Sequence, residues 1–230
     1  TMELGGHAPV LIFNDADIDT AINIMAPFKT RNAGQVCISP TRFLVQDKIA
    51  DQFTDGFINA LEKTKIGNGL DKDTEMGPMA NERRIPVIEE MISDAKAKGA
   101  KVASGGGRIG NKGYFFQPTV LTDVPTDATM MNEEPFGPVA IVNRFSTYED
   151  AITEANRLPF GLASYAFTSS GETAQRLGQE METGMLTINH MGLSLPEVPF
   201  GGVKDSGYGT EGGSEAIQAY LETRFVSTQA

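Results

Sequence analysis

The chain has 230 residues, of which 40% are hydrophobic and 21% are charged, the balance of an ordinary globular protein. It holds 19 lysines and arginines against 30 aspartates and glutamates, and the resulting net charge of −11 argues against nucleic-acid binding. One cysteine cannot form an internal disulfide, two histidines are too few for a zinc cluster, and no apolar run approaches the roughly 20 residues that a membrane span needs. We therefore expect a protein of the reducing cytoplasm that binds no metal and no membrane. Because the chain does not begin with Met, we also expect a longer parent protein.

Short apolar runs and helical spacings alternate along most of the chain. In chain order they predict a strand over 9–13, a helix over 17–30, a strand over 42–45, a helix over 81–98, and strands over 119–121 and 139–142. The capping boxes Thr147-x-x-Asp150 and Ser169-x-x-Glu172 predict the starts of two further helices, which are followed by strands over 163–167 and 185–188, respectively. This alternation is typical of an α/β fold, in which helices cover both faces of a parallel sheet.

The end of the chain has a different character. Residues 190–213 contain two prolines and seven glycines, and an irregular segment of that length is usually functional. Residues 214–220 are expected to form a short helix and residues 222–228 a strand. That strand has no obvious partner among the preceding elements, so we expect it to pair elsewhere in the parent protein or in another subunit.

Cys37 is the first candidate for chemistry. A lone cysteine is more often an inert small hydrophobe, but the turn Gly34-Gln35-Val36-Cys37 lets a thiol and its own N–H project in the same direction. That geometry supplies a nucleophile and half of an oxyanion site. Because a free thiol has a pKa of about 8.5, it needs a base at neutral pH. Glu3 is the candidate, unless it is only a solvated carboxylate at a frayed terminus.

Two further segments carry side chains suited to binding. The run from Glu133 to Pro138, Glu-Glu-Pro-Phe-Gly-Pro, holds one carboxylate and the Phe136 ring in a fixed relation, which suits ribose hydroxyls and a flat ring. It also reads as a polar turn before a strand. Arg31, six residues before Cys37, offers a planar fork for a carboxylate, or it merely opposes the dipole at a helix C-terminus.

Eight motifs together resemble the aldehyde dehydrogenase superfamily, in the family's own order. They are ELGG at 3–6, GQVC at 34–37, IGNGLDKDTEMGP at 66–78, FFQPTVL at 115–121, EEPFGPV at 133–139, LPFGLAS at 158–164, GMLTIN at 184–189 and PFGGVKDSGYGTEGG at 199–213. The resemblance covers nearly the whole chain and corresponds to the family's C-terminal half. It implies a catalytic domain over residues 1–213 and a tail over residues 214–230, whose strand joins an oligomerisation sheet in a homodimer or homotetramer. The N-terminal nucleotide-binding domain of the family is not in this chain.

The resemblance also assigns roles. Cys37 is the expected nucleophile and Glu3 its base, while Glu134 is expected to hold the nicotinamide ribose of NAD or NADP and Phe136 to pack beside the ring. The expected reaction is oxidation of an aldehyde to a carboxylate. The rival interpretations are a non-catalytic homologue with a structural or binding role, and a thiol esterase that uses Cys37 without a cofactor.

The substrate is expected to be an ω-semialdehyde, because the chain looks closest to the succinate-semialdehyde branch. Arg31 stands where those enzymes bind the distal carboxylate of the substrate. Ser194 lies near a serine that they also use, although the alignment allows Leu195 in that place. Other ω-semialdehydes and aromatic aldehydes stay open.

Overall fold

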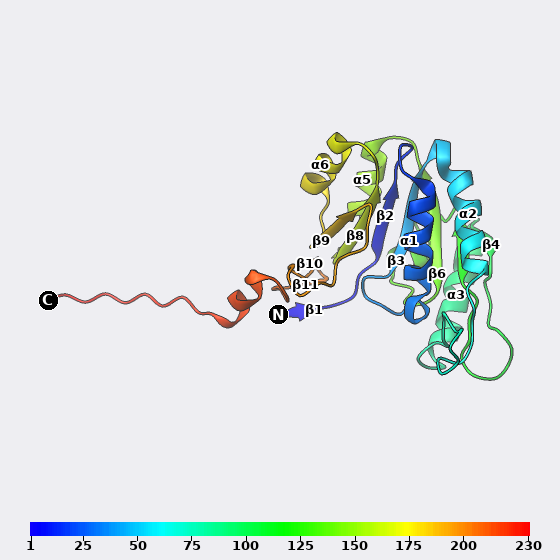
Figure 1. Ribbon diagram of the computed structural model, residues 1–230, viewed down its shortest axis with the longest axis horizontal. Coiled ribbons are helices and arrows are strands. Elements are labelled where there is room, and N and C mark those ends of the chain that lie inside the picture. Colours follow the sequence, from blue (N-terminus) through cyan, green and yellow to red (C-terminus); the bar gives the residue numbers. More distant parts are fainter.

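The computed structural model describes residues 1–230 as a layered α/β domain with an extended C-terminal segment (Figure 1). Its strands are β1 (Met2–Glu3), β2 (Ala8–Ile12), β3 (Pro40–Gln46), β4 (Lys101–Ser104), β5 (Thr119–Thr122), β6 (Val139–Phe145), β7 (Phe160–Gly161), β8 (Ala163–Phe167), β9 (Met185–Ile188), β10 (Val203–Lys204) and β11 (Gly207–Tyr208). Its α-helices are α1 (Ile18–Thr30), α2 (Ala50–Glu62), α3 (Arg84–Ala97), α4 (Thr129–Asn132), α5 (Tyr148–Asn156) and α6 (Gly171–Glu180). Short 3₁₀ helices are η1 (Arg31–Gly34), η2 (Asp47–Ile49) and η3 (Ser214–Tyr220).

A seven-stranded sheet forms the centre, in the order β4-β5-β6-β3-β2-β8-β9. Every neighbouring pair is parallel except β4 and β5, which are antiparallel. The predicted fold class is thus confirmed, as are six of the seven predicted strands. The one strand of this sheet that the sequence did not predict is β4. It lies at the edge of the sheet and none of its side chains is fully buried, so its residues form no apolar run.

Alternate residues of the strands pack against different helices, as a pleated sheet requires. Val10 and Ile12 of β2 belong to the cluster shared with α1 and α2, whereas Leu11 packs with α5 and α6 on the opposite face. A third cluster joins β5 and β6 to α3 and α4. Buried residues fall on both faces, so the strands read as continuous apolar runs.

The helix predictions hold, with shifted boundaries. Asp17 caps α1 by accepting from the Thr20 N–H at 3.0 Å, and Thr147 and Asp150 form the expected capping box at α5. The box expected at Ser169 is wrong by one residue. Ser170 is the cap of α6, because Ser169 instead donates its N–H and hydroxyl to the Asp15 carboxylate, at 3.1 and 3.0 Å.

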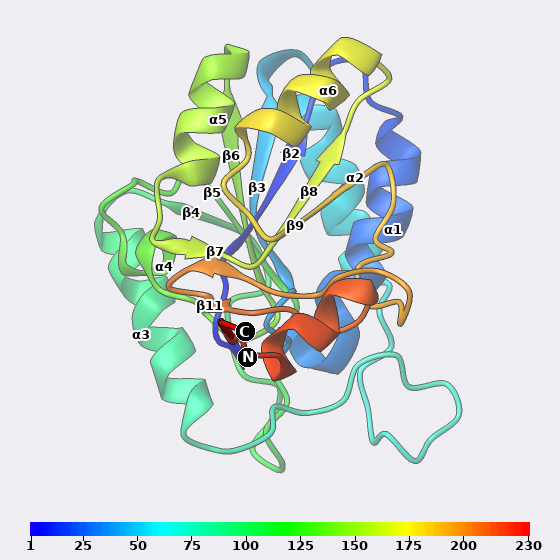
Figure 2. The same cartoon turned by 90° about the vertical axis from the view of Figure 1, so that its left-hand side faces the viewer.

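Two small antiparallel pairs, β1 with β11 and β10 with β7, lie beneath the main sheet, at the end where β2 begins (Figure 2). Ser206, which is fully buried, fastens this region: its hydroxyl donates to the Gly5 carbonyl at 2.7 Å and accepts from the Gly161 N–H at 3.0 Å. The Leu4 N–H donates to the Ser206 carbonyl at 2.9 Å. Residues 2–5 are thereby held against the loop that follows β10.

Residues after η3 run away from the domain without helix or strand (Figure 1). The strand expected over 222–228 is therefore not formed in this chain, because a strand requires a hydrogen-bonded neighbour and no other segment passes beside it. The short helix expected over 214–220 is present as η3. No helix of the protein has the length and apolar character needed to cross a membrane.

Candidate active site

The predicted nucleophile lies in a tight turn between α1 and β3. Asn32 and Ala33 take positive φ angles of 51° and 52°, and the Asn32 amide donates to the Gln35 carbonyl at 2.9 Å while the Gln35 amide donates back to the Asn32 carbonyl at 3.0 Å. Gly34, at φ 70°, passes so close to the Gly137 carbonyl that a β-carbon would overlap it. These constraints place Cys37 directly before β3 and against the segment that precedes β6.

Three segments that are far apart in sequence meet at this edge of the sheet. Residues 3–6 precede β2, the Cys37 turn precedes β3 and Glu134 precedes β6, and the amino ends of parallel strands share one edge. A β-carbon on Gly6 would lie 2.9 Å from the Cys37 carbonyl oxygen, so only glycine allows this approach. The Gly6 N–H donates to Glu134 Oε1 at 3.3 Å.

The environment of Cys37 favours the thiol over the thiolate. Its pKa is raised to about 12, chiefly by burial and further by the neighbouring carboxylates of Glu3 and Glu134, against an opposing contribution from the Ile38 N–H. Tyr165, buried in β8, supports the same segment by donating its hydroxyl to the Ile38 carbonyl at 2.7 Å. The charge of Glu3 thus acts on the Cys37 thiol, and the segment that carries Glu3 packs beside the Cys37 turn.

Glu134 and Phe136 stand side by side on the segment between α4 and β6. Burial raises the pKa of the Glu134 carboxyl, whereas the Gly6 N–H and the charges of Arg84 and Lys29 lower it. Phe136 has φ 44°, in the left-handed region, and 36% of its surface is exposed. The pair therefore presents a half-buried carboxylate and an accessible aromatic ring.

Lys29 is a buried cation that the sequence analysis did not single out. It is 1% exposed, it lies in the last turn of α1, and its Nζ donates to Ser39 Oγ at 3.2 Å. Burial lowers its pKa to about 7, and the charge of Glu134 acts in the opposite sense. A signal was available, because Lys29 continues the spacing of Ile22 and Met25 on the buried face of α1.

The two predicted substrate-binding residues lie at the surface. Arg31 is exposed where α1 ends, and Ser194 is exposed in the loop after β9. Neither side chain has a hydrogen bond or ion pair within the chain, so neither is joined to Cys37, Glu3 or Glu134. Both are free to meet a ligand.

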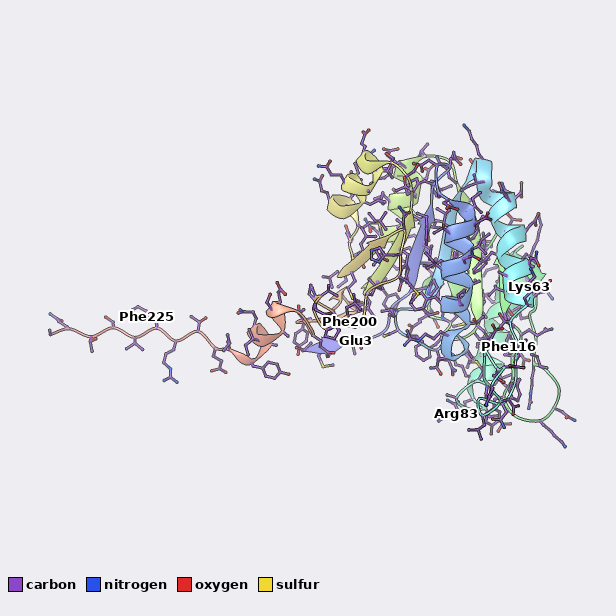
Figure 3. All side chains as sticks on the ribbon, viewed as in Figure 1. Glu3, Lys63, Arg83, Phe116, Phe200 and Phe225 are labelled. Atoms are coloured by element: carbon purple, nitrogen blue, oxygen red, sulfur yellow. The ribbon has the colours of Figure 1, made fainter.

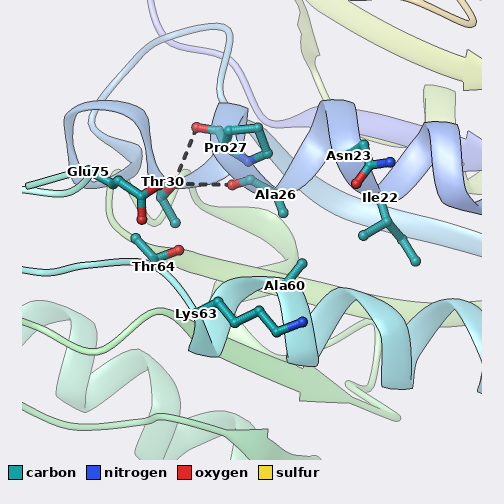
Figure 4. A pocket seen from close by; sticks show the side chains of 9 residues that line it. All are labelled: Ile22, Asn23, Ala26, Pro27, Thr30, Ala60, Lys63, Thr64 and Glu75. Carbon is teal, nitrogen blue, oxygen red and sulfur yellow. Dashed lines mark hydrogen bonds between the residues drawn. The ribbon is translucent and has the colours of Figure 1, made fainter. Parts of the chain in front are cut away.

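A separate groove of about 490 Å³ lies between α1 and α2 (Figure 4). Its lining residues are Ile22, Asn23, Ala26, Pro27, Thr30, Ala60, Lys63, Thr64 and Glu75, none of which is a predicted site residue. Thr30 donates its hydroxyl to the carbonyls of Ala26 and Pro27, at 3.2 and 3.3 Å, and so serves the helix end. The Cys37 cluster is distinct from this groove.

The site therefore holds a half-buried cysteine, a carboxylate whose charge acts on its thiol, and a second carboxylate two residues from an exposed aromatic ring. The chain belongs to the aldehyde dehydrogenase family, whose model ("Aldehyde dehydrogenase family") matches residues 1–226.

Known relatives are similar over almost the whole chain. It is 48% identical over 227 residues to the 4-(hydroxymethyl)benzenesulfonate dehydrogenase of Comamonas testosteroni, covering 98% of this chain and 47% of the relative. It is 42% identical to the succinate-semialdehyde dehydrogenase GabD of Escherichia coli K12, with coverage of 98% and 47%. A crystal structure of betaine aldehyde dehydrogenase from Staphylococcus aureus in complex with NAD+ superposes with a TM-score of 0.91 at 40% identity, over 96% of this chain and 44% of that one. The chain spans about half the length of the relatives that it matches.

The predicted family is therefore confirmed, and succinate-semialdehyde dehydrogenases are among the relatives. Their identity of about 42% is below the 48% of the benzenesulfonate enzyme. The expected NAD or NADP agrees with the names of these relatives, since GabD is named for NADP+ and the betaine aldehyde dehydrogenase is solved with NAD+.

Proposed function

We propose that the whole protein oxidises an aldehyde to the corresponding carboxylate with NAD or NADP, and that Cys37 and Glu3 act at the aldehyde carbon. The observation that carries the proposal is the close packing of residues 3–6 against the Cys37 turn, where a β-carbon on Gly6 would lie 2.9 Å from the Cys37 carbonyl oxygen and the charges of Glu3 and Glu134 act on the thiol. Membership of the family supports it.

In the proposed reaction, the Cys37 sulfur attacks the aldehyde carbon while its proton passes to Glu3, and the alkoxide form of a thiohemiacetal results. Glu3 is exposed, so it can return this proton to solvent. Loss of a hydride from the substrate carbon leaves a thioester on Cys37. Glu3 then takes a proton from the attacking water, and cleavage of the carbon–sulfur bond releases the carboxylate and restores the cysteine.

Glu134 and Phe136 are proposed to hold the cofactor. A half-buried carboxylate suits the hydroxyls of a ribose, and an exposed ring two residues later suits a flat heterocycle, so the residues present fit such a group. When bound, NAD or NADP supplies the acceptor for the hydride. Lys29 and Arg84 favour the ionised form of Glu134, which is the better hydrogen-bond acceptor.

The substrate is proposed to be an aldehyde with an anionic group at its far end, succinic semialdehyde being the first choice. Arg31 offers a guanidinium without a partner in the chain, and Ser194 offers a hydroxyl. The names of the relatives support an anionic group, since one enzyme is named for succinate semialdehyde and another for a benzenesulfonate. An aromatic sulfonate or carboxylate aldehyde is the second choice.

The test compares the whole protein that contains residues 1–230 with its Cys37→Ala variant. Nicotinamide reduction is followed with succinic semialdehyde, 4-formylbenzenesulfonate, and uncharged butyraldehyde and benzaldehyde, each with NAD and with NADP. We expect Cys37→Ala to lower turnover by about 10⁴-fold or more, and Arg31→Met to raise KM for the charged aldehydes only. Wild-type turnover that survives Cys37→Ala would contradict the role of the cysteine.

The same assay separates the rival functions. A thiol esterase would hydrolyse p-nitrophenyl acetate as its main activity and would show no aldehyde-dependent reduction of nicotinamide. A non-catalytic homologue would neither hydrolyse the ester nor reduce nicotinamide with any of the four aldehydes. Equal KM for charged and uncharged aldehydes would keep the dehydrogenase and remove Arg31 and Ser194 from the substrate site.

At the level of organisation, we propose that residues 1–213 are the catalytic domain and residues 214–230 an assembly tail of a homodimer or homotetramer. The exposed and unpaired state of the tail supports this division. The reducing cytoplasm stays our proposed location, because the single cysteine is assigned a role as a free thiol.

A further inference from the structure

Arg84, the first residue of α3, holds the backbone of the segment that carries Glu134 and Phe136. Its Nε donates to the Pro135 carbonyl at 3.0 Å, and its Nη2 donates to the Glu134 carbonyl at 3.1 Å and also to the Pro135 carbonyl. The planar guanidinium is suited to this task, because it presents several N–H groups in one plane. The contact joins residues that are 50 and 51 positions apart in the sequence.

The held segment has little support of its own. No backbone N–H donates to the carbonyl of Glu134 or Pro135, and proline has no N–H to offer in return. The next residue, Phe136, has φ 44°, a backbone conformation that a bulky side chain rarely adopts. Such a conformation persists only where the surroundings enforce it. Arg84 supplies the hydrogen bonds directly before this residue.

Arg84 also acts through its charge. Burial lowers its own pKa, and the charges of Glu134 and Glu133 act in the opposite sense, so the cation lies near both carboxylates. In turn, the positive charge of Arg84 favours the ionised form of Glu134. One side chain therefore constrains both the backbone and the charge of the segment.

We propose that Arg84 is a positioning residue for the cofactor, which fixes the Glu134 carboxylate and the Phe136 ring in the arrangement that grips the nicotinamide ribose. This inference rests on the proposed function, since the cofactor roles of Glu134 and Phe136 belong to it. Arg84 itself touches neither the substrate nor the reacting atoms.

The experiment uses the whole protein with Arg84→Met, Arg84→Lys and, as the matched control, Arg83→Met. Arg83 is the neighbouring arginine, is exposed, and its side chain has no hydrogen bond or ion pair in the chain (Figure 3). We expect Arg84→Met to raise KM for NAD or NADP about 10-fold, because two carbonyls lose donors from a charged group, with little change in KM for the aldehyde. Arg83→Met should match the wild type.

The lysine variant separates the backbone role from the charge. An ammonium cannot bind two carbonyls in one plane, so Arg84→Lys should leave the cofactor KM raised. It keeps the positive charge, so the pH at which cofactor binding weakens on acidification should stay near that of the wild type. In Arg84→Met this pH should move upward, because the Glu134 carboxylate loses a cation.

A second readout does not depend on activity. Amide hydrogen exchange over residues 133–138 of the cofactor-free protein should be faster in Arg84→Met than in the wild type and Arg83→Met. If the methionine variant does not fold, Arg84→Gln gives the same comparison, because its side chain keeps one donor group, the amide NH2, and carries no charge. Unchanged exchange together with an unchanged cofactor KM would overturn the proposal. If the wild type oxidises no aldehyde, the proposed function fails, and the exchange comparison still decides whether Arg84 holds the segment.

Discussion

Cys37 rests as a thiol because burial and the Glu3 carboxylate both oppose a further negative charge beside them. A thiolate is the better nucleophile, so the arrangement couples attack to proton transfer rather than storing an anion. Glu3 has two opposite effects in this site. It raises the thiol pKa in the resting protein, and in the proposed reaction it accepts the thiol proton.

This double effect predicts the outcome of Glu3→Gln. Glutamine removes the negative charge, so the pKa of Cys37 should fall below its value of about 12 and remain above that of a free thiol, because burial persists. The rate of alkylation by iodoacetamide, measured against pH, should therefore rise at lower pH than in the wild type. Aldehyde oxidation should nevertheless fall by about 10²-fold or more, because the base is lost.

Glu133→Gln is the control for this titration. Glu133 is an exposed carboxylate next to Glu134, and it is not among the main causes of the raised Cys37 pKa. Its alkylation profile should match that of the wild type. A profile for Glu3→Gln that moves to higher pH would show that Glu3 does not act on the thiol through its charge.

Among the elements, β3 carries the most constrained charged residue. Arg42 is 1% exposed, and its guanidinium donates to the carbonyls of His7 at 3.0 Å, Glu154 at 2.8 Å and Ala155 at 3.0 Å. It also pairs with the Glu154 carboxylate at 3.0 Å. One side chain therefore joins the start of β2 to the end of α5.

Removal of Arg42 should be costly. Arg42→Met removes a donor from three carbonyls and from the Glu154 carboxylate, which keeps its pair with Arg157. We expect a loss of about 3–5 kcal/mol in the free energy of unfolding. Arg42→Lys should recover little of it, because an ammonium cannot reach all four oxygen atoms. Thermal unfolding followed by circular dichroism measures the change, with the exposed Arg83→Met expected to stay within about 0.5 kcal/mol of the wild type. An Arg42→Met protein as stable as that control would show that the hydrogen bonds of Arg42 do not stabilise the fold.

The elements that the sequence predicts are those whose buried residues form a continuous apolar run or recur at helical spacing. Five of the six predicted sheet strands are buried on both faces along most of their length, whereas β9 alternates buried and half-buried residues. Helix α3 places Ile85, Ile88 and Ile92 on its buried side. By contrast, α2 was not predicted, although Phe53, Phe57 and Leu61 repeat at helical spacing. The edge strand β4 gave no signal, since half of its residues face solvent and only one neighbour pairs with it.

Some residues of the candidate site could be predicted from the sequence and others could not. The pairing of Cys37 with Glu3 was expected from the resemblance to the family, which assigned a role to each residue. Arg84 could not be found from the sequence, because its hydrogen bonds join α3 to a turn about fifty residues away. Contacts of that range depend on how the helices pack on the sheet, which no local pattern encodes.

At the scale of the whole molecule, the C-terminal segment exposes large apolar side chains that no other part of the chain covers. Leu221, Phe225 and Val226 are 59%, 89% and 75% exposed, respectively, on an extended stretch that lies away from the domain (Figure 3). Large apolar side chains gathered on an unpaired segment are typical of an interface. This agrees with the proposed assembly tail and with a strand that forms only beside a partner.

The tail is testable through its most exposed aromatic residue. Phe225→Asp in the whole protein should shift the assembly toward smaller species, since a charge in a buried interface opposes association. Size-exclusion chromatography with light scattering over a range of concentrations measures the mass. Leu70→Asp is the matched control, because Leu70 is 90% exposed but lies in a loop of the domain. Equal masses for the two variants would remove residues 221–230 from the interface.

The packing of Gly34 against the Gly137 carbonyl has a consequence for protein engineering. The Cys37 turn and the proposed cofactor segment fit together only while Gly34 lacks a side chain, so the two loops depend on each other although they lie about 100 residues apart in the sequence. A chimera that takes one loop from a relative and keeps the other native must preserve this fit. Otherwise the two loops clash within the candidate site. Segments 31–37 and 133–138 are therefore best exchanged as a pair, whereas 221–230 can be recombined independently of them.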